Sequence, residues 1–221
     1  MGDFGVLQIA VDPNNRTTIV DERPVSTVPP HVRSFGFVPN LRQCLPGDLI
    51  LFRNTTPNVL DRVISRAQRE FHSDDAQWTH AAVYLYDDKI VEAVPFKGVR
   101  TRSLYGDVPH RIFRIRRRAD LQERDRYKIA LRALTMLGSR YSLRAAISIG
   151  WQTSLGLWDR VFSINFGPVI ICSKVFHDAY VEITRSLLEG CSIDQPIKPA
   201  HLSATTDLDD VDVGWIELPQ E

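Results

Sequence analysis

The sequence predicts an α+β fold, and two kinds of pattern support that prediction. Short runs rich in β-branched and aromatic residues, above all those on either side of Asp87-Asp88-Lys89, indicate paired strands. Apolar residues at helical spacing precede and follow these runs, at 56–67, 120–138 and 172–187. Strands with helices before and after them are typical of the α+β class.

We expect residues 1–44 to form an extended N-terminal lead-in and residues 45–221 to form the main domain. Turn and breaker residues recur in the lead-in, at Asp12-Pro13-Asn14-Asn15 and Val28-Pro29-Pro30, with little periodicity. One short strand is predicted within it, at 6–11. The chain of 221 residues is long enough for one well-buried domain.

A helix is predicted to start at Thr56-Pro57, because proline is favoured in the first turn of a helix. Its buried stripe would consist of Leu60, Val63, Ile64 and Ala67. Four possible metal ligands come after this helix: His72, Asp74, Asp75 and His80. Their spacing matches no metal-site motif, so we interpret this stretch as a solvated loop and expect no metal or cofactor.

Two β-prone runs separated by a polar turn then predict a β-hairpin. The runs are 78–86 and 90–94, and the turn is Asp87-Asp88-Lys89. His80 opens the first strand and Glu92 lies inside the second. In a regular two-residue hairpin His80 would face Pro95, so contact between His80 and Glu92 requires a bulge or a strong twist.

The run 111–118 is the one basic stretch, and its interleaved apolar residues favour a strand with solvated arginines over a nucleic-acid site. The whole chain has 27 basic and 27 acidic residues, so no net field attracts nucleic acid. Asp120 and Glu123 then resemble a capping box that opens a helix ending at Gly138. Its buried stripe would consist of Tyr127, Ala130, Leu131, Leu134 and Leu137.

The segment between Ala145 and Ser173 contains many large apolar residues, and its only charged residues are Asp159 and Arg160. We interpret it as buried core, because large apolar side chains are usually buried for packing. The alternative is an apolar lid or acyl-binding wall beside Cys172.

Cys172 stands where the uncharged run 166–171 gives way to a helical pattern. The apolar stripe of that helix would consist of Val175, Phe176, Ala179, Tyr180, Ile183 and Leu187. Cys172 would then lie in the first turn, where unpaired backbone N–H groups and the helix dipole stabilise a thiolate. Position alone agrees equally well with a buried structural cysteine.

The combination of Cys172, His80 and Glu92 favours the reactive interpretation. A cysteine nucleophile needs a base that takes its proton and a polar group that orients that base. Each of the three residues also has an ordinary explanation when it is taken alone. Together they could supply nucleophile, base and orienting group.

Four short blocks of the sequence occur in an order that we associate with one family. They are Leu45-Pro46-Gly47-Asp48-Leu49-Ile50-Leu51-Phe52, Thr79-His80-Ala81-Ala82-Val83-Tyr84-Leu85, Ile90-Val91-Glu92-Ala93 and Cys172-Ser173-Lys174-Val175-Phe176. In these blocks the chain resembles the circularly permuted NlpC-type papain-like cysteine hydrolases, in the YiiX/YaeF-like branch related to the lecithin:retinol acyltransferase-like proteins. A weaker block, 138–142, is similar to a Gly-x-x-Tyr-Asp block of that family, but Ser142 stands where the family often has aspartate.

The resemblance implies a papain-like fold with an antiparallel sheet and with the nucleophile at a helix N-terminus. It further implies Cys172 as nucleophile, His80 as base and Glu92 as orienting residue. The histidine precedes the cysteine in that group, the reverse of papain, and the same order holds here. The implied activity is that of a cysteine peptidase or amidase acting on an amide bond in peptidoglycan peptides. Lipid ester or thioester acyl hydrolysis or transfer is the alternative, and a catalytically silent binding module is a further one.

The remaining expectations concern partners and location. Three cysteines without close metal-type spacing argue against a disulfide framework or a zinc site. No basic region leads into an apolar core at the N-terminus, and no apolar run is long enough to cross a membrane. We therefore expect a chain made in the cytoplasm, whose export would need a dedicated secretion machine. Its partner would be a peptide or acyl substrate, with no nucleic acid.

Overall fold

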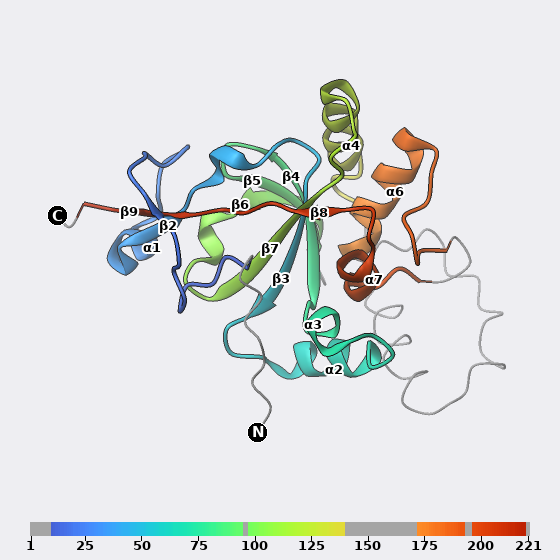
Figure 1. Ribbon diagram of the computed structural model, residues 1–221, viewed down its shortest axis with the longest axis horizontal. Coiled ribbons are helices and arrows are strands. Elements are labelled where there is room, and N and C mark those ends of the chain that lie inside the picture. The colour runs from blue at the N-terminus through green and yellow to red at the C-terminus, as the bar shows by residue number, and fades with distance from the viewer. Residues whose placement is uncertain (1–9, 95–96, 140–171, 193–195, 220–221) are drawn as a thin grey trace.

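The computed structural model describes residues 10–94, 97–139, 172–192 and 196–219, and their main feature is a six-stranded sheet (Figure 1). In spatial order its strands are β6 (Gly98–Ser103), β5 (Lys89–Val94), β4 (His80–Tyr86), β3 (Leu49–Asn54), β7 (Arg111–Arg117) and β8 (Asp209–Asp210). All neighbouring strands in this sheet are antiparallel. The described residues therefore form an α+β structure with an antiparallel sheet, as predicted.

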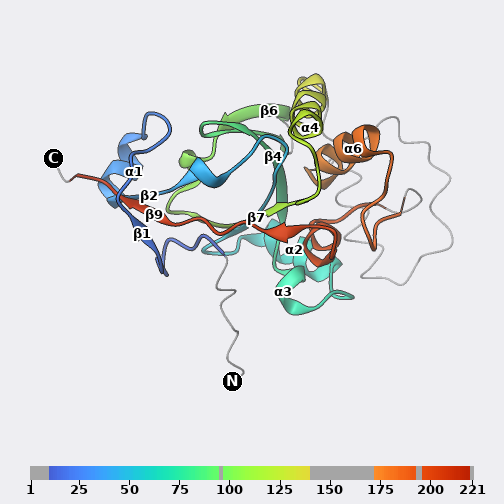
Figure 2. The ribbon, with the colours of Figure 1, turned by 45° about the horizontal axis from the view of Figure 1, so that its top comes forward.

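Three helices cover one face of this sheet (Figures 1 and 2). They are α4 (Glu123–Thr135), α6 (Cys172–Thr184) and α7 (Pro199–Ala204). Helix α6 packs on β4 and β5, and α4 packs on α6 and β4. Fully buried side chains such as Leu51, Val83 and Val175 fill the layer between the strands and these helices.

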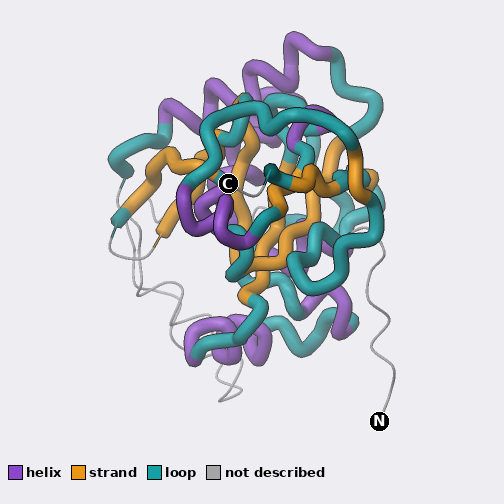
Figure 3. Tube along the Cα trace, turned by 90° about the vertical axis from the view of Figure 1, so that its left-hand side faces the viewer, coloured by secondary structure: helices purple, strands orange, loops and turns teal. Residues whose placement is uncertain are grey.

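The other face of the sheet is covered by a three-stranded sheet and by the short helix α1 (Pro30–Phe35). The small sheet has the order β1 (Ile19–Val20), β9 (Trp215–Glu217) and β2 (Phe37–Pro39). Figure 3 views the molecule from this side, with the C-terminus towards the viewer. Two single-turn 3-10 helices, η1 (Leu41–Gln43) and η2 (Tyr105–Asp107), connect strands near it. A second buried cluster, which includes Val38, Phe52 and Trp215, fills this layer.

The structure differs from the predicted extended lead-in at residues 1–44. Residues 30–35 are helical, and two strands from this segment pair with β9 from the far end of the chain. Proline in the first turn starts α1 and Gly36, with a φ of 83°, ends it. Most of the strand predicted at 6–11 lies outside the described residues, but Val11 forms a β-bridge with Phe113 of β7.

The predicted hairpin is present as β4 and β5, and its register contains the irregularity that the sequence required. Tyr86 pairs with Lys89, whereas Tyr84 pairs with Ile90 and Ala82 pairs with Glu92. The shift between Tyr84 and Tyr86 is a β-bulge, which moves the rest of the strand by one position. Side chains two residues apart share a face, so His80 becomes a diagonal neighbour of Glu92 across the two strands.

Helix α2 (Val59–Ala67) begins two residues after the predicted start, and most of its predicted stripe is not buried. Asn58 and Asp61 form a capping box at its N-terminus. Leu60 and Val63 are 41% and 43% exposed, so the prediction that they are core was wrong. Ala67 is buried as predicted, and the other buried residue of the helix is Asp61, which was not part of the predicted stripe. Together with the single turn α3 (Ser73–Ala76), it lies at the end of the sheet where β4 begins (Figure 1).

Helix α4 was located correctly, but its cap was predicted wrongly, and of its predicted buried stripe only Ala130 is buried, with Leu134 half-buried. Asp120 forms an ion pair with Arg118 at 2.7 Å, and the helix starts after Gln122 without a side-chain cap. Tyr127, Leu131 and Leu137 are largely exposed. The face against the core consists of Arg126, Ile129, Ala130 and Ala133. Arg126 belongs there because it donates to the carbonyl of Arg118 at 2.7 Å.

Helix α6 agrees with its predicted stripe over its first two turns. Val175, Phe176, Ala179 and Tyr180 are all buried, and Ile183 is half-buried. Leu187 is the exception, because the helix ends at Thr184 and Leu187 is exposed in the following loop.

Strand β7 confirms the prediction of a strand in the basic run, but its arginines are not all solvated. Arg114 and Arg116 are buried. Arg114 makes two hydrogen bonds to the carboxylate of Asp210, and Arg116 donates to the carbonyls of Leu202 and Ser203. The prediction failed because these acceptors come from α7 and β8, between 86 and 96 residues further along the chain.

Three sequence predictions fall wholly or partly on residues that the structure does not describe. These are the end of the block at 138–142, the apolar segment up to residue 171 and the start of the strand at 6–11. Among the described helices, none is both long and apolar enough to cross a membrane.

Candidate active site

His80 and Glu92 are in direct contact at one end of the sheet. His80 is the first residue of β4, and its Nε2 lies 2.8 Å from Oε2 of Glu92 on β5. A carboxylate can only accept, so the Nε2–H of His80 donates this bond. The bond fixes the tautomer of the ring and leaves Nδ1 for a second partner.

Glu92 is held by more than His80. Its side chain is 1% exposed, and two arginines from β6 donate to it. Arg102 binds both carboxylate oxygens, from Nε at 2.6 Å and from Nη2 at 2.9 Å. Arg100 binds Oε1 from Nε at 3.1 Å and from Nη2 at 2.9 Å. Burial tends to raise the pKa of Glu92, but His80 and Arg102 outweigh it and hold that pKa well below its usual range.

Cys172 is the third residue of the candidate site and contacts His80, as Glu92 does. The described part of α6 begins at Cys172, and its thiol is hydrogen-bonded with the His80 side chain. The backbone N–H groups of Ala81 and Ser173 also bond to the sulfur. Cys172 is 8% exposed, so these bonds operate in surroundings that contain little water.

These contacts shift the proton equilibria of the Cys172–His80 pair in opposite directions. Burial tends to raise the pKa of the Cys172 thiol, but the charge and hydrogen bond of His80 lower it below its ordinary value. Burial tends to lower the pKa of His80, but Cys172 and Glu92 raise it to about 9. Both shifts favour a thiolate beside an imidazolium at neutral pH.

A pocket of about 180 Å³ opens onto these three side chains. Besides Cys172, His80 and Glu92 it is lined by Phe52, Arg53, Asn54, Asn58, Leu60, Asp61, Ile64, Thr79, Val94, Arg100 and Arg111. The lining is contributed by β3, α2, β4, β5, β6, β7 and α6, so it is assembled from distant parts of the chain. A small acyl group could reach the sulfur of Cys172 through this pocket.

The other two cysteines lack such surroundings. Cys44 is buried, and burial together with the Asp48 carboxylate raises its pKa well above the usual range. Burial and then Asp207 raise the pKa of Cys191 to about 11. Neither residue lines the pocket.

The residues considered as metal ligands do not converge. Asp75 accepts from Ser203 at 2.6 Å, whereas His80 bonds to Glu92. His72 stays local, with its Nδ1 3.4 Å from the N–H of Asp74. Within the described part of the chain, no group of three or more His, Cys, Asp or Glu side chains could hold a metal ion.

The structure thus brings together the three residues that the sequence singled out, and it adds two that sequence reasoning missed. Arg100 and Arg102 were not predicted. The alternation Arg100-Thr101-Arg102 in a strand directly after the hairpin places both arginines on one face, and that signal could have revealed them.

Comparison of the sequence with known protein families finds no match, and a search of curated proteins finds none either.

Proposed function

We propose that this chain is a cysteine hydrolase of the papain-like, permuted NlpC type. The observation that carries the proposal is the unbroken series of contacts from Cys172 through His80 to Glu92 inside one pocket. It supplies nucleophile, base and orienting group in the arrangement that thiol hydrolases need. The resemblance of the four sequence blocks, and the order His80, Glu92, Cys172 along the chain, support the same family.

In the proposed reaction the Cys172 thiolate attacks the carbonyl carbon of an amide and forms a tetrahedral intermediate. Backbone N–H groups at the start of α6 would stabilise its oxyanion. The His80 imidazolium then gives its proton to the leaving amine, and an acyl-thioester remains on Cys172. Water, deprotonated by His80, hydrolyses that thioester and restores the thiol. Glu92 keeps the His80 ring in the orientation that both steps need.

We take an amide bond in peptidoglycan peptides as the first substrate. The pocket is small, and nine of its fourteen lining residues are polar or charged, among them Asn54, Asn58 and Arg111. Such a lining suits a short polar group, for example one amino-acid side chain, better than a long acyl chain.

A lipid ester or acyl thioester is the second candidate, and one observation favours it. Helix α2 exposes the apolar side chains of Val59, Leu60 and Val63, and Leu60 also lines the pocket. An acyl chain lying along α2 would cover that apolar surface, which otherwise faces water.

Two sets of measurements test the proposal with the purified full chain. The first is release of new amines from peptidoglycan peptides by the wild type and by Cys172→Ala, His80→Ala and Cys191→Ala. We expect activity in the wild type and in Cys191→Ala, which removes a thiol away from the pocket, and nearly none in the other two variants. The second set offers phospholipids and acyl thioesters to the same proteins.

The outcomes separate the candidates. Lipid or thioester cleavage that disappears in Cys172→Ala, without action on peptidoglycan peptides, would move the second candidate to first place. A folded chain without activity on any of these substrates, and whose Cys172 reacts no faster than an ordinary thiol, would be a binding module and not an enzyme.

A further inference from the structure

Three arginines line the same pocket as the candidate nucleophile. They are Arg53 on β3, Arg100 on β6 and Arg111 on β7. The side chains of Arg100 and Arg111 are 37% and 30% exposed, so ligands can reach both from the solvent. The bonds to Glu92 account for Arg100. Attack on a carbonyl uses neither Arg53 nor Arg111 directly, so the reaction leaves the presence of these two cations in the pocket unexplained.

The two carboxylates that line the pocket are already occupied by donors from the protein. Asp61 accepts from Thr79 Oγ1 at 2.9 Å through Oδ1, and from Asn54 Nδ2 at 2.6 Å and the N–H of Asn58 at 2.9 Å through Oδ2. Glu92 is filled by His80, Arg100 and Arg102 as described above. A ligand in the pocket therefore finds few free acceptors.

The donors, in contrast, are only partly used. Arg111 donates from Nε to Asn54 Oδ1 at 3.1 Å and lies 3.6 Å from Asp107, while its buried Nη1 finds no partner among the described residues. The buried Nε of Arg53 also has no hydrogen-bond partner among the described residues. Burial lowers the pKa of Arg53, and the nearby Asp12 carboxylate only partly opposes this. Buried donors without partners are unfavourable, so binding of an acceptor would stabilise both side chains.

We propose that this pocket binds a carboxylate of the substrate next to the scissile carbonyl, with Arg111 and Arg53 as its recognition residues. The substrate class is then an acyl compound with a carboxylate close to the amide, such as a peptide with an acidic residue there. Guanidinium groups suit this role, because they offer paired donors and stay charged when partly buried. This inference rests on the proposed function, since it assumes that acyl groups reach Cys172 through the pocket.

The test compares two small alkylating agents that differ only in charge, iodoacetate and iodoacetamide. In both reactions the Cys172 thiolate displaces iodide and a sulfur–carbon bond replaces the carbon–iodine bond. Only iodoacetate brings a carboxylate into the pocket. The quantity measured is the ratio of the two rate constants at Cys172, followed by mass spectrometry of the full chain at neutral pH and low salt.

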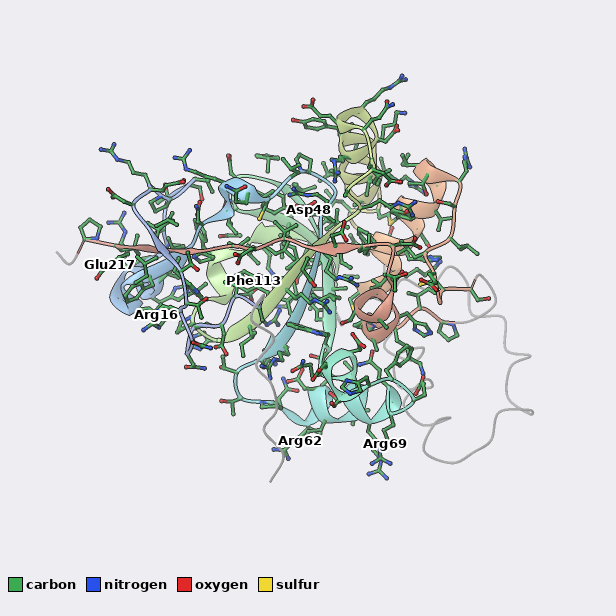
Figure 4. All side chains as sticks on the ribbon, in the orientation of Figure 1. Arg16, Asp48, Arg62, Arg69, Phe113 and Glu217 are labelled. Carbon is green, nitrogen blue, oxygen red and sulfur yellow. The ribbon has the colours of Figure 1, made fainter. Side chains whose placement is uncertain are left out.

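The variants are Arg111→Gln, Arg53→Gln and the control Arg62→Gln. Arg62 is exposed on α2, does not line the pocket, and is directed away from the molecule at its outer margin (Figure 4). We expect the iodoacetate-to-iodoacetamide ratio to fall about 3- to 10-fold in each of the first two variants, the effect of removing one nearby charge. Arg62→Gln should keep the wild-type ratio, and Arg111→Lys should restore most of it.

The outcomes distinguish this inference from the proposed function. If Cys172 reacts with neither agent faster than an ordinary thiol, the proposed function fails. If Cys172 reacts rapidly but all variants share one ratio, the carboxylate site alone is wrong. A fall as large in Arg62→Gln as in Arg111→Gln would show a general charge effect and would also overturn the inference.

A second measurement uses the reaction itself. Two peptide amides that are identical except for glutamate or glutamine beside the scissile bond are compared by kcat/KM. We expect a preference for glutamate in the wild type that shrinks about 3- to 10-fold in Arg111→Gln. Equal kcat/KM values for the two peptides in the wild type would contradict the inference.

Discussion

The three cysteines of the chain lie in very different electrostatic surroundings, and their reactivities should differ accordingly. Only at Cys172 do the charge and hydrogen bond of a cationic partner, His80, lower the pKa of the thiol below its ordinary value. Since burial and Asp207 raise the pKa of Cys191 to about 11, about one Cys191 in ten thousand is a thiolate at pH 7. Cys44 is protonated more strongly still.

We therefore predict that limited alkylation of the folded protein at pH 7 labels Cys172 before the other two cysteines. Peptide mapping after short exposure to iodoacetamide measures the order of labelling. His80→Ala serves as the control, because it should slow Cys172 without changing Cys191. Earlier labelling of Cys44 or Cys191 in the wild type would argue against Cys172 as the nucleophile.

The pH dependence of the reaction follows from the same pair. The active form has Cys172 deprotonated and His80 protonated. It appears as the pH rises through the pKa of Cys172, which lies below its ordinary value, and it is lost as His80 deprotonates near pH 9. We predict a bell-shaped profile of kcat/KM whose alkaline side falls near pH 9. Activity on an amide that keeps rising beyond pH 10 would mean that His80 does not protonate the leaving group.

The Glu92 carboxylate is the counter-charge of Arg100 and Arg102 and also the hydrogen-bond partner of His80. Its replacement should therefore affect both stability and catalysis. We predict that Glu92→Gln lowers kcat/KM about 100-fold, with residual activity, because the orientation of His80 is weakened. We also predict a loss of about 3 kcal/mol in the free energy of unfolding, because Arg100 and Arg102 lose a buried counter-charge. Urea unfolding at pH 7 measures this loss, with Glu123→Gln on the exposed side of α4 as control.

The sign of the pH effect on stability gives an independent check on Glu92. Its pKa is lower in the folded chain than its ordinary value of about 4.5, so its contribution is present above that pH and is lost as the pH falls below it. The free energy of unfolding of Glu92→Gln should thus fall less steeply than that of the wild type between pH 5 and pH 3. Parallel curves for the two proteins would show that Glu92 is not strongly paired in solution.

At the scale of elements, the turn before β3 explains a block that the sequence could only offer as a resemblance. Asp48 is buried, accepts from Arg117 Nε at 2.8 Å and Nη2 at 2.7 Å, and also accepts from the N–H of Leu45. Gly47 has a φ of +86°, and a Cβ added to it would lie 2.7 Å from the carbonyl oxygen of Arg126. The turn at the start of β3 therefore packs directly against the backbone of the first turns of α4.

Gly47→Ala should therefore destabilise the protein by about 2–3 kcal/mol, because it combines a strained backbone conformation with a contact that only main-chain movement can relieve. Gly106→Ala is the matched control, since an added Cβ there meets nothing within 4 Å. Thermal and urea unfolding of both variants measure the difference. Equal stability of the two variants would mean that α4 can move away from the turn without cost.

Local sequence patterns located several of the helices and strands but not all of their contacts. The hairpin, β7, α4 and α6 were all located from local patterns, because strand and helix periodicity depend on neighbouring residues. The buried face of α4 was not, because Arg126 is placed inward by acceptors on a segment preceding the helix. The contact of His80 with Glu92 needed the bulge between Tyr84 and Tyr86, which no turn residue indicates.

At the scale of the whole molecule, the two ends of the described chain meet in the small sheet. Strand β9 lies between β1 and β2, and Trp215 pairs with Ile19 on one side and with Pro39 on the other. Such pairing joins residues almost 200 positions apart, so no local pattern could predict it. It explains why residues 10–44 are part of a folded layer instead of an extended lead-in.

This layer packs on the face of the main sheet that also carries His80 and Glu92. Trp215 is 2% exposed and belongs to the same buried cluster as Phe52, Tyr84 and Cys44. The strands that hold the candidate site therefore pack, on that same face, against a layer built from both ends of the chain. Loss of packing in this layer should lower the stability of the whole domain, because both sheets share one buried cluster.

We predict that Trp215→Ala lowers the free energy of unfolding by about 3–5 kcal/mol and still leaves a single cooperative transition. Urea unfolding followed by circular dichroism and by alkylation of the buried Cys44 should then give one shared midpoint. Leu187→Ala, which removes an exposed side chain, is the control and should change stability by less than about 0.5 kcal/mol. If Cys44 became reactive well below the main transition, the small sheet would unfold on its own, and the candidate site would not depend on it.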